Sequence, residues 1–228
     1  LNKVHEEMAS SELQMKVDSD IVRTYRNAGL YEEWDKMSDI FIQRYPESEN
    51  SAIYRGIKLA KTGEYESAEA IFDSLIVVWT EKDEYKDIPE SKSRVASTSL
   101  QFDALLADFR ENHAAAAESW GKSVELLSDK IPFHEQWFLR YRWAESHHNA
   151  GNSEKSLDIL APMLKANPRL INHLVLRVKC HLELKQVELA RKSLEQLEWS
   201  LAKADADFPA RKEAEELALK VSALAVGD

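Results

Sequence analysis

A short phrase recurs along this chain at a spacing of tens of residues. The stretch "TGEYESAEAIF" at 62–72 has an earlier counterpart, "AGLYEEWDKMSDIF" at 28–41, and a later one, "AGNSEKSLDIL" at 150–160. The turn residues of these phrases and of two weaker copies are separated by 34, 49, 39 and 34 residues: Gly29, Gly63, Asn112, Gly151 and Lys185. Two equal intervals of 34 residues indicate an array of structural repeats.

The residue types within the phrase fit two antiparallel helices joined by a tight turn. Gly or Asn at the marker takes the left-handed conformation that ends the first helix. Five residues later comes a mostly small residue for a close helix crossing: Trp34, Ala68, Ala117, Ser156 and Ala190. Nine residues after the marker comes a position filled in three copies by a large apolar side chain: Ser38, Phe72, Gly121, Leu160 and Leu194. One such hairpin cannot bury its apolar face alone, whereas stacked neighbours can.

At these residues the chain resembles the tetratricopeptide repeat (TPR) family, most clearly at Gly56, Gly63, Tyr65, Ala68 and Phe72. The resemblance implies an all-α protein, an α-solenoid of stacked antiparallel helical hairpins in a superhelix. We predict one repeat domain over residues 1–228, with repeats at about 15–48, 49–82, 98–131, 137–170 and 171–204. Departures from the family pattern are Trp34 at a small-residue position, a third copy without glycine marker or aromatic residue, and Lys185 at a turn.

Two segments fall outside the repeat pattern. Between the second and third copies lies a charged stretch, "WTEKDEYKDIPESKS", in which Pro89 breaks any helix, so we expect two long helices joined by this loop. After the fifth copy we predict a closing helix at about 208–225, starting near Pro209 with Asp207 as its N-cap. Its inward-facing residues should be Ala214, Leu217, Val221 and Leu224.

Composition limits the classes of function. The chain has 228 residues and only 6 Gly and 6 Pro, which favours helices over strands and tight turns. Its net charge of −10 repels phosphate and anionic lipid, so we expect no nucleic acid partner and no membrane insertion. We expect a cytoplasmic protein, and the start at Leu1 suggests a piece of a longer one. Cys180 lies in an apolar setting and should be buried and inert.

No sequence motif indicates catalysis or a cofactor. The chain contains no GxSxG, GxxxxGK[ST], GxGxxG or CxxC. Among the histidines, His147 and His148 are adjacent and point about 100° apart on a helix, so they cannot easily share a metal ion. His147 and His181 occupy equivalent repeat positions, where hydrogen-bonded histidines between helices are the simpler interpretation. We therefore expect no enzyme activity, no metal and no cofactor.

The TPR resemblance also implies where a partner would bind. In that family the first helix of each repeat lines a concave groove, and the register places these residues there: Arg23, Arg26, Asn27, Tyr54, Lys61, Phe102, Arg110, Phe138, Tyr141, Arg142, Glu145, His148, Asn149, Asn172 and Lys179. Basic and aromatic residues dominate this set, which favours a protein or extended peptide, in particular an acidic one. Arg142 is its centre, and Arg142→Glu should abolish binding while leaving the thermal melting nearly unchanged.

The prediction is thus a non-catalytic protein-interaction or scaffold module within a larger protein. The alternative is a sensory domain whose groove takes a small ligand or a peptide and which signals to an attached effector. The carboxylate clamp of the chaperone-tail-binding TPR proteins is not reproduced in three consecutive repeats. The 14-3-3 fold, also acidic, helical and of this length, lacks a 34-residue period.

Overall fold

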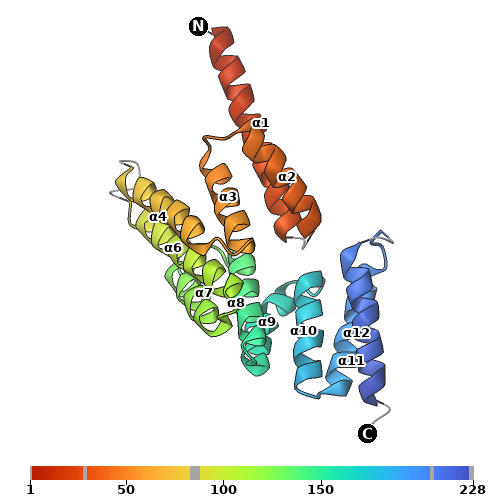
Figure 1. Ribbon diagram of the computed structural model, residues 1–228. Coiled ribbons are helices and arrows are strands. Elements are labelled where there is room, and N and C mark those ends of the chain that lie inside the picture. The colour runs from red at the N-terminus through yellow and green to blue at the C-terminus, as the bar shows by residue number, and fades with distance from the viewer. Residues whose placement is uncertain (1, 28–29, 83–87, 206–207, 226–228) are drawn as a thin grey trace. The chain divides into compact units, whose positions relative to one another are not determined.

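The computed structural model describes residues 2–27, 30–82, 88–205 and 208–225, without the side chains of residues 2–10, 27, 89, 90 and 225. These described residues form eleven α-helices and one 3-10 helix and contain no β-strand, which confirms the all-α class. None of the described helices has the length and apolar character needed to cross a membrane. The chain divides into two compact units, Leu1–Trp79 and Thr80–Asp228 (Figure 1).

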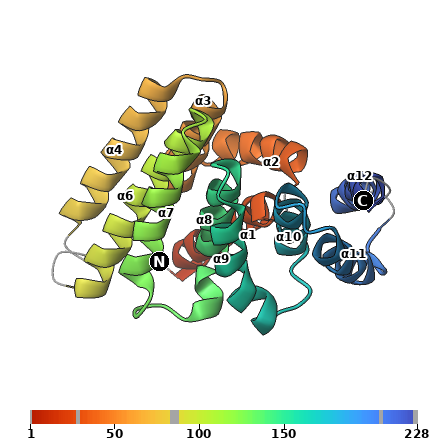
Figure 2. The ribbon, with the colours of Figure 1, turned by 90° about the horizontal axis from the view of Figure 1, so that it is seen from below.

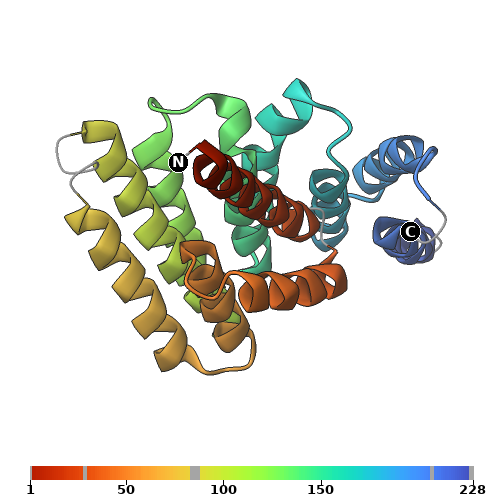
Figure 3. The same ribbon diagram turned by 90° about the horizontal axis from the view of Figure 1, so that it is seen from above.

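The first unit contains four helices: α1 (Asn2–Asn27), α2 (Tyr31–Arg44), α3 (Glu49–Lys61) and α4 (Tyr65–Glu81), the last of which runs two residues past the boundary. Helix α1 packs against α2, and α2 packs against α3 (Figure 3). Two prolines help to set the boundaries of these elements and of their later counterparts. Helix α2 ends two residues before Pro46, and the corresponding helix of the second unit ends two residues before Pro168.

Close approach of α3 and α4 depends on a glycine. Gly56 lies in the interior of α3 and is buried, and a Cβ atom added there would overlap the ring of Phe72 on α4. Ala68, the predicted small residue of this hairpin, has no exposed surface. The Trp34 side chain of α2 is also buried, with its ring edge-on to Tyr54 at 6.4 Å between centroids. The first hairpin therefore accommodates a large residue where the repeat pattern expects a small one.

The second unit contains seven α-helices and a 3-10 turn: α6 (Pro89–Phe109), α7 (His113–Leu127), η1 (Phe133–Gln136), α8 (Trp137–Asn149), α9 (Ser153–Ala166), α10 (Ile171–Glu183), α11 (Val187–Leu201) and α12 (Pro209–Ala225). Each α-helix packs against the next, from α6 to α12 (Figure 2). In addition α10 contacts both α8 and α12, so three alternate helices share one side of this unit. The predicted long helices on either side of the charged stretch are α4, of 17 residues, and α6, of 21.

Of the five predicted turn markers, three have the expected left-handed backbone, one does not, and Gly29 lies outside the described residues. Gly63, Gly151 and Lys185 have φ of 87°, 79° and 56°, but between α6 and α7 the left-handed residue is Glu111, with φ 59°, rather than Asn112. After each of these four residues, the next one donates its backbone N–H to the carbonyl five positions earlier, at 2.8–2.9 Å. This is the hydrogen bond that closes a Schellman-type helix end.

Asn112 has a different role, and the third copy of the repeat has to be realigned. Its side chain caps α7 by accepting from the backbone N–H of Ala115. Moving the marker to Glu111 places Ala116 and Trp120, both fully buried, at the small and the large apolar positions. The prediction of Ala117 and Gly121 at these positions, and of a third copy without an aromatic residue, was therefore wrong by one residue of register.

The buried residues of the second unit include two apolar clusters. One lies mainly among α6, α7 and α8 around Trp120, and the other extends from α8 to α12 around Leu160, Met163 and Leu197. Trp143 of α8 packs against both clusters. Cys180 belongs to the second cluster and is buried, and burial raises the pKa of its thiol, in agreement with an inert cysteine.

The closing helix lies where the sequence placed it, with one difference. Ala214, Leu217 and Val221 of α12 are buried as predicted, but Leu224 is 40% exposed and does not pack inward. Asp207, the predicted N-cap, lies outside the described residues.

Candidate functional site

A buried carboxylate joins three helices of the second unit. Asp108, in the last turn of α6, is only 12% exposed. It accepts hydrogen bonds from Arg142 Nη2 at 3.0 Å, Ser146 Oγ at 3.0 Å and Trp120 Nε1 at 3.2 Å. His113 Nδ1 lies 3.3 Å from Asp108 Oδ1, the oxygen that accepts from Ser146 at 3.0 Å. The sequence analysis did not single out Asp108, because nothing in a linear pattern distinguishes it from the many solvated acidic residues.

The groups around Asp108 continue along α8. Arg142 also donates to Glu145, one turn further on, and its guanidinium lies over the Trp120 ring at 5.7 Å. Tyr141 donates its hydroxyl to the same Glu145 at 2.9 Å. The guanidinium that we expected at the centre of a peptide groove is thus a half-buried member of an internal network. The expectation that Arg142→Glu leaves the melting unchanged is therefore revised, because a glutamate there would face two carboxylates.

One depression of the second unit is formed by three alternate helices, α8, α10 and α12. Its volume is about 460 Å³, and its lining residues come from the C-terminal parts of α8 and α10 and from the middle of α12: His148, Asn149, Lys179, Leu182, Glu183, Leu217 and Lys220. Three of them, His148, Asn149 and Lys179, were predicted groove residues. The structure therefore brings part of the predicted set together on one side of this unit.

His148 at the wall of the depression is held by two partners. Its Nδ1 lies 2.8 Å from Ser153 Oγ and 2.9 Å from a carboxylate oxygen of Glu183, and Ser153 donates to that same carboxylate. Burial lowers the pKa of His148, and the nearby Glu183 opposes this shift. A catalytic serine needs the two ring nitrogens to contact serine and acid separately. Here one nitrogen reaches both, and Ser153 is 1% exposed, so the geometry is that of a structural cluster.

The polar residues that line the depression differ in whether they form ion pairs or hydrogen bonds with other side chains. Lys179 of α10 forms an ion pair with Glu213 of α12 at 2.6 Å. By contrast, Asn149 and Lys220 make no hydrogen bond or ion pair with any side chain that the structure describes. Leu182, which is half-buried, and Leu217, which is 3% exposed, also line the depression. The depression therefore presents one amide, one ammonium group and mainly the side chain of Leu182 to a ligand.

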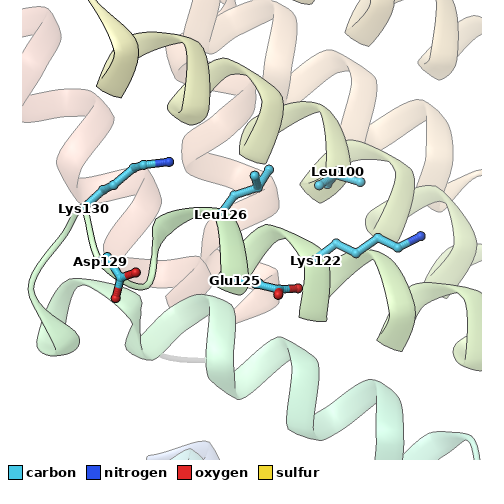
Figure 4. A pocket seen from close by; sticks show the side chains of 6 residues that line it. All are labelled: Leu100, Lys122, Glu125, Leu126, Asp129 and Lys130. Atoms are coloured by element: carbon cyan, nitrogen blue, oxygen red, sulfur yellow. The ribbon is translucent and has the colours of Figure 1, made fainter.

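A second depression lies between α6 and α7 and contains none of the predicted residues. Its volume is also about 460 Å³, and it is lined by Leu100, Lys122, Glu125, Leu126, Asp129 and Lys130. Figure 4 shows Lys122 and Lys130 at its two ends with Leu126 between them. Both cations are engaged, Lys122 with Glu118 at 2.6 Å and Lys130 with Ser93 at 2.7 Å. This surface is the weaker candidate for a binding site.

The other predicted groove residues of the second unit lie in different environments. Phe102 is buried in the core, which corrects its assignment to a groove. Phe138 is half-buried with its ring edge-on to Trp120 at 6.2 Å, and Asn172 is half-buried on α10. Arg110 is exposed just after the end of α6.

The predicted residues of the first unit are also mixed. Tyr54 is buried, and its hydroxyl lies 3.1 Å from Ser19 Oγ, so its assignment to a groove was wrong. Arg23 pairs with Asp20 at 2.7 Å, and Lys61 pairs with Asp35 at 2.5 Å. Arg26 is half-buried, and the side chain of Asn27 lies outside the described residues.

The remaining histidines contact rings and turns. His181 Nδ1 lies 2.7 Å from Gln186 Oε1, across the turn between α10 and α11. His147 lies beside the Trp143 ring at 5.9 Å. Within the described part of the chain, no three His, Cys, Asp or Glu side chains are arranged to hold a metal ion.

Comparison with known proteins does not assign the chain to a family. No protein-family model matches the chain, and no curated protein has significant sequence similarity to it.

Proposed function

We propose that this chain is a non-catalytic protein-interaction module of stacked, TPR-like helical hairpins, and that the face formed by α8, α10 and α12 binds an extended peptide. The observation that carries the proposal is the depression on these three helices. Its lining includes Leu182 and Leu217 together with Asn149 and Lys220, and these last two form no hydrogen bond or ion pair with any described side chain. Exposed donors that no described side chain of the protein engages, next to apolar surface, are available to the carbonyl and carboxylate groups of a peptide.

The stacking part of the proposal is supported by packing and turns within the second unit. Helix α10 contacts both of its alternate neighbours, α8 and α12, as first helices of successive repeats would. The same turn geometry recurs at Glu111, Gly151 and Lys185. A repeated turn and a repeated contact favour a solenoid, in which each hairpin buries its apolar face against the next.

The ion pairs change the kind of peptide that we propose. Arg142 and Lys179 are engaged by acidic side chains of the chain itself, so a strongly acidic ligand would have to displace them. A better match has one carboxylate for Lys220, a backbone carbonyl for the Asn149 amide and one apolar side chain for the leucines. This peptide is less acidic than the one that the sequence alone favoured.

The proposal is tested by selecting binders from a displayed peptide library and measuring their affinity by calorimetry. Lys220→Glu should weaken a selected peptide about tenfold or more, since a charge-assisted hydrogen bond is replaced by repulsion. Lys212→Glu, on the exposed surface of the same helix and outside the depression, is the matched control and should change the affinity less than twofold. Equal effects of the two substitutions would refute the assignment of this face.

A small ligand is the second candidate, and the size of the depression favours it. A volume of about 460 Å³ falls within the range of small-molecule sites, about 300–1,000 Å³. In that case a sensory role for the domain would replace the interaction role. A metabolite-sized compound that shifts the melting temperature of the wild type, but not of Lys220→Glu, would favour this alternative.

A further inference from the structure

An exposed tryptophan of the second unit carries an arginine stacked on its ring. The guanidinium carbon of Arg169, in the loop between α9 and α10, lies 4.0 Å from the ring centroid of Trp199 on α11. The indole nevertheless remains 56% exposed. Trp and Arg are, with Tyr, the residue types enriched among side chains that dominate binding energy at protein interfaces.

The loop that carries Arg169 is fixed by hydrogen bonds on both sides. The backbone N–H of Arg169 donates to Asn167 Oδ1 at 3.0 Å, and Gln196 Nε2 of α11 donates to the carbonyl of Pro168 at 2.8 Å. Gln196 is in turn held by Arg177 of α10, which donates to its Oε1 at 2.6 Å. These hydrogen bonds hold the backbone of Arg169 beside α11, and the guanidinium lies over the indole through the ring contact.

The charge of Arg169 is not neutralised within the described part of the chain. No ion pair or side-chain hydrogen bond of its guanidinium is present there. On α11, Glu195 stands one helical turn before Trp199 and the exposed Glu198 directly before it, and Lys203 follows the end of the helix. The Arg169 guanidinium is the cation that lies on the exposed ring.

We propose that Arg169 and Trp199 form a second recognition element, for a segment of a protein partner that carries a carboxylate next to an apolar side chain. The guanidinium offers two parallel N–H donors to a carboxylate, and the indole offers a flat apolar surface beside them. The element goes beyond the proposed peptide site. It precedes the N-terminus of α10, whereas the depression lies at the C-terminal end of that helix. A helix of 13 residues is about 20 Å long, so the two sites are separated by about that distance.

The test uses a capped peptide of alternating glutamate and leucine and its glutamine-for-glutamate counterpart. Binding is followed through the indole N–H resonance of Trp199 in ¹⁵N-labelled protein, assigned by its loss in Trp199→Phe. The glutamate peptide should shift this resonance in a saturable manner. The affinity of the glutamine peptide should be lower by about tenfold or more. Arg169→Gln should abolish the difference between the two peptides, and Arg169→Lys should not restore it, because an ammonium group cannot stack or bind bidentately.

The matched control is Arg191→Gln on α11. Arg191 is also exposed, but it pairs with Glu188 at 3.2 Å and stacks on no ring that the structure describes, so its loss should leave the titration unchanged. Equal affinity for both peptides, an unchanged preference in Arg169→Gln, or no response of the Trp199 resonance would each overturn the proposal. A response to inorganic phosphate as strong as that to the glutamate peptide would also overturn it, because the element would then recognise phosphate.

Discussion

Arg142 on α8 and Asp108 on α6 form an ion pair at 3.0 Å, and both side chains are largely buried, at 19% and 12% exposure. The pair joins helices that we assign to two different repeats. Such a pair stabilises a fold only while it is complete, because removal of one partner leaves a buried charge without compensation. Arg142, which the sequence suggested as a ligand contact, is thus better described as a residue that fixes α8 against α6.

Removal of the Asp108 carboxylate should destabilise the second unit. In Asp108→Ala the donors of Arg142, Ser146 and Trp120 lose their acceptor, and we expect a loss of about 3 kcal/mol in the free energy of unfolding. Urea denaturation followed by circular dichroism measures this loss. Glu118→Ala, which removes the exposed partner of Lys122, is the control and should leave the denaturation midpoint almost unchanged.

A methyl group at Gly56 should destabilise the first unit although it favours the helix. Alanine raises helix propensity by about 1 kcal/mol, but its Cβ would overlap the Phe72 ring, and overpacking costs about 1–3 kcal/mol. We expect Gly56→Ala to lower the denaturation midpoint. The double variant with Phe72→Leu should show less than the sum of the two single losses, and strict additivity would mean that the two residues are not in contact.

His173 should make stability depend on pH. It is buried against the Tyr141 ring at 5.0 Å, and desolvation lowers its pKa from 6.5 to about 4. Between these values the unfolded chain binds the proton and the folded chain does not, so stability falls as the pH drops from 6.5 to 4, by up to about 3 kcal/mol.

The pH dependence is measured by denaturation at several pH values in His173→Phe, which keeps an aromatic ring against Tyr141. This variant should show a smaller decline between pH 6.5 and 4 than the wild type, whereas His134→Gln at the exposed surface should retain the full decline. The decline that remains in His173→Phe comes in part from His147, His148 and His181, whose pKa values burial also lowers. An equal decline in wild type and His173→Phe would contradict the assignment.

Enlarging a crossing residue should be costly only where the side chain is buried. Ala68 on α4 has no exposed surface, so Ala68→Leu should lower the unfolding free energy by about 1–3 kcal/mol. Ala70, two residues on, is exposed, and Ala70→Leu should have almost no effect on the denaturation midpoint. Similar midpoints for both variants would show that the repeat register is wrong.

The sequence predicted well those features that follow from local patterns. The helical class, the turn at Gly63, the buried Ala68 and Ala190 and the helix starting at Pro209 depend on nearby residues, and the structure contains all of them. The third copy was misaligned because Glu111 takes a left-handed conformation that asparagine usually prefers, while Asn112 caps the next helix. The left-handed turn residue is thus Glu111 and not Asn112, which is the N-cap of α7.

The site was predicted less well because its chemistry depends on pairs that are far apart in sequence. A helical register indicates which side of a helix Arg142 or Lys179 occupies, but not that Asp108 and Glu213 neutralise them. Tyr54 and Phe102 were assigned to a groove because aromatic residues serve both cores and ligand surfaces, and here they lie in the core. His148, Asn149 and Lys179 line one depression because they lie on α8 and α10, which contact each other, and that a peptide binds there stays a prediction.

The most direct test of the account is amide hydrogen exchange of the chain with and without a selected peptide. We predict slower exchange at the C-terminal ends of α8 and α10 and in the middle of α12, the three segments that line the depression, with little change in α7, α9 and α11. Protection confined to α7, α9 and α11, or spread evenly over the second unit, would contradict a peptide site on the face of α8, α10 and α12.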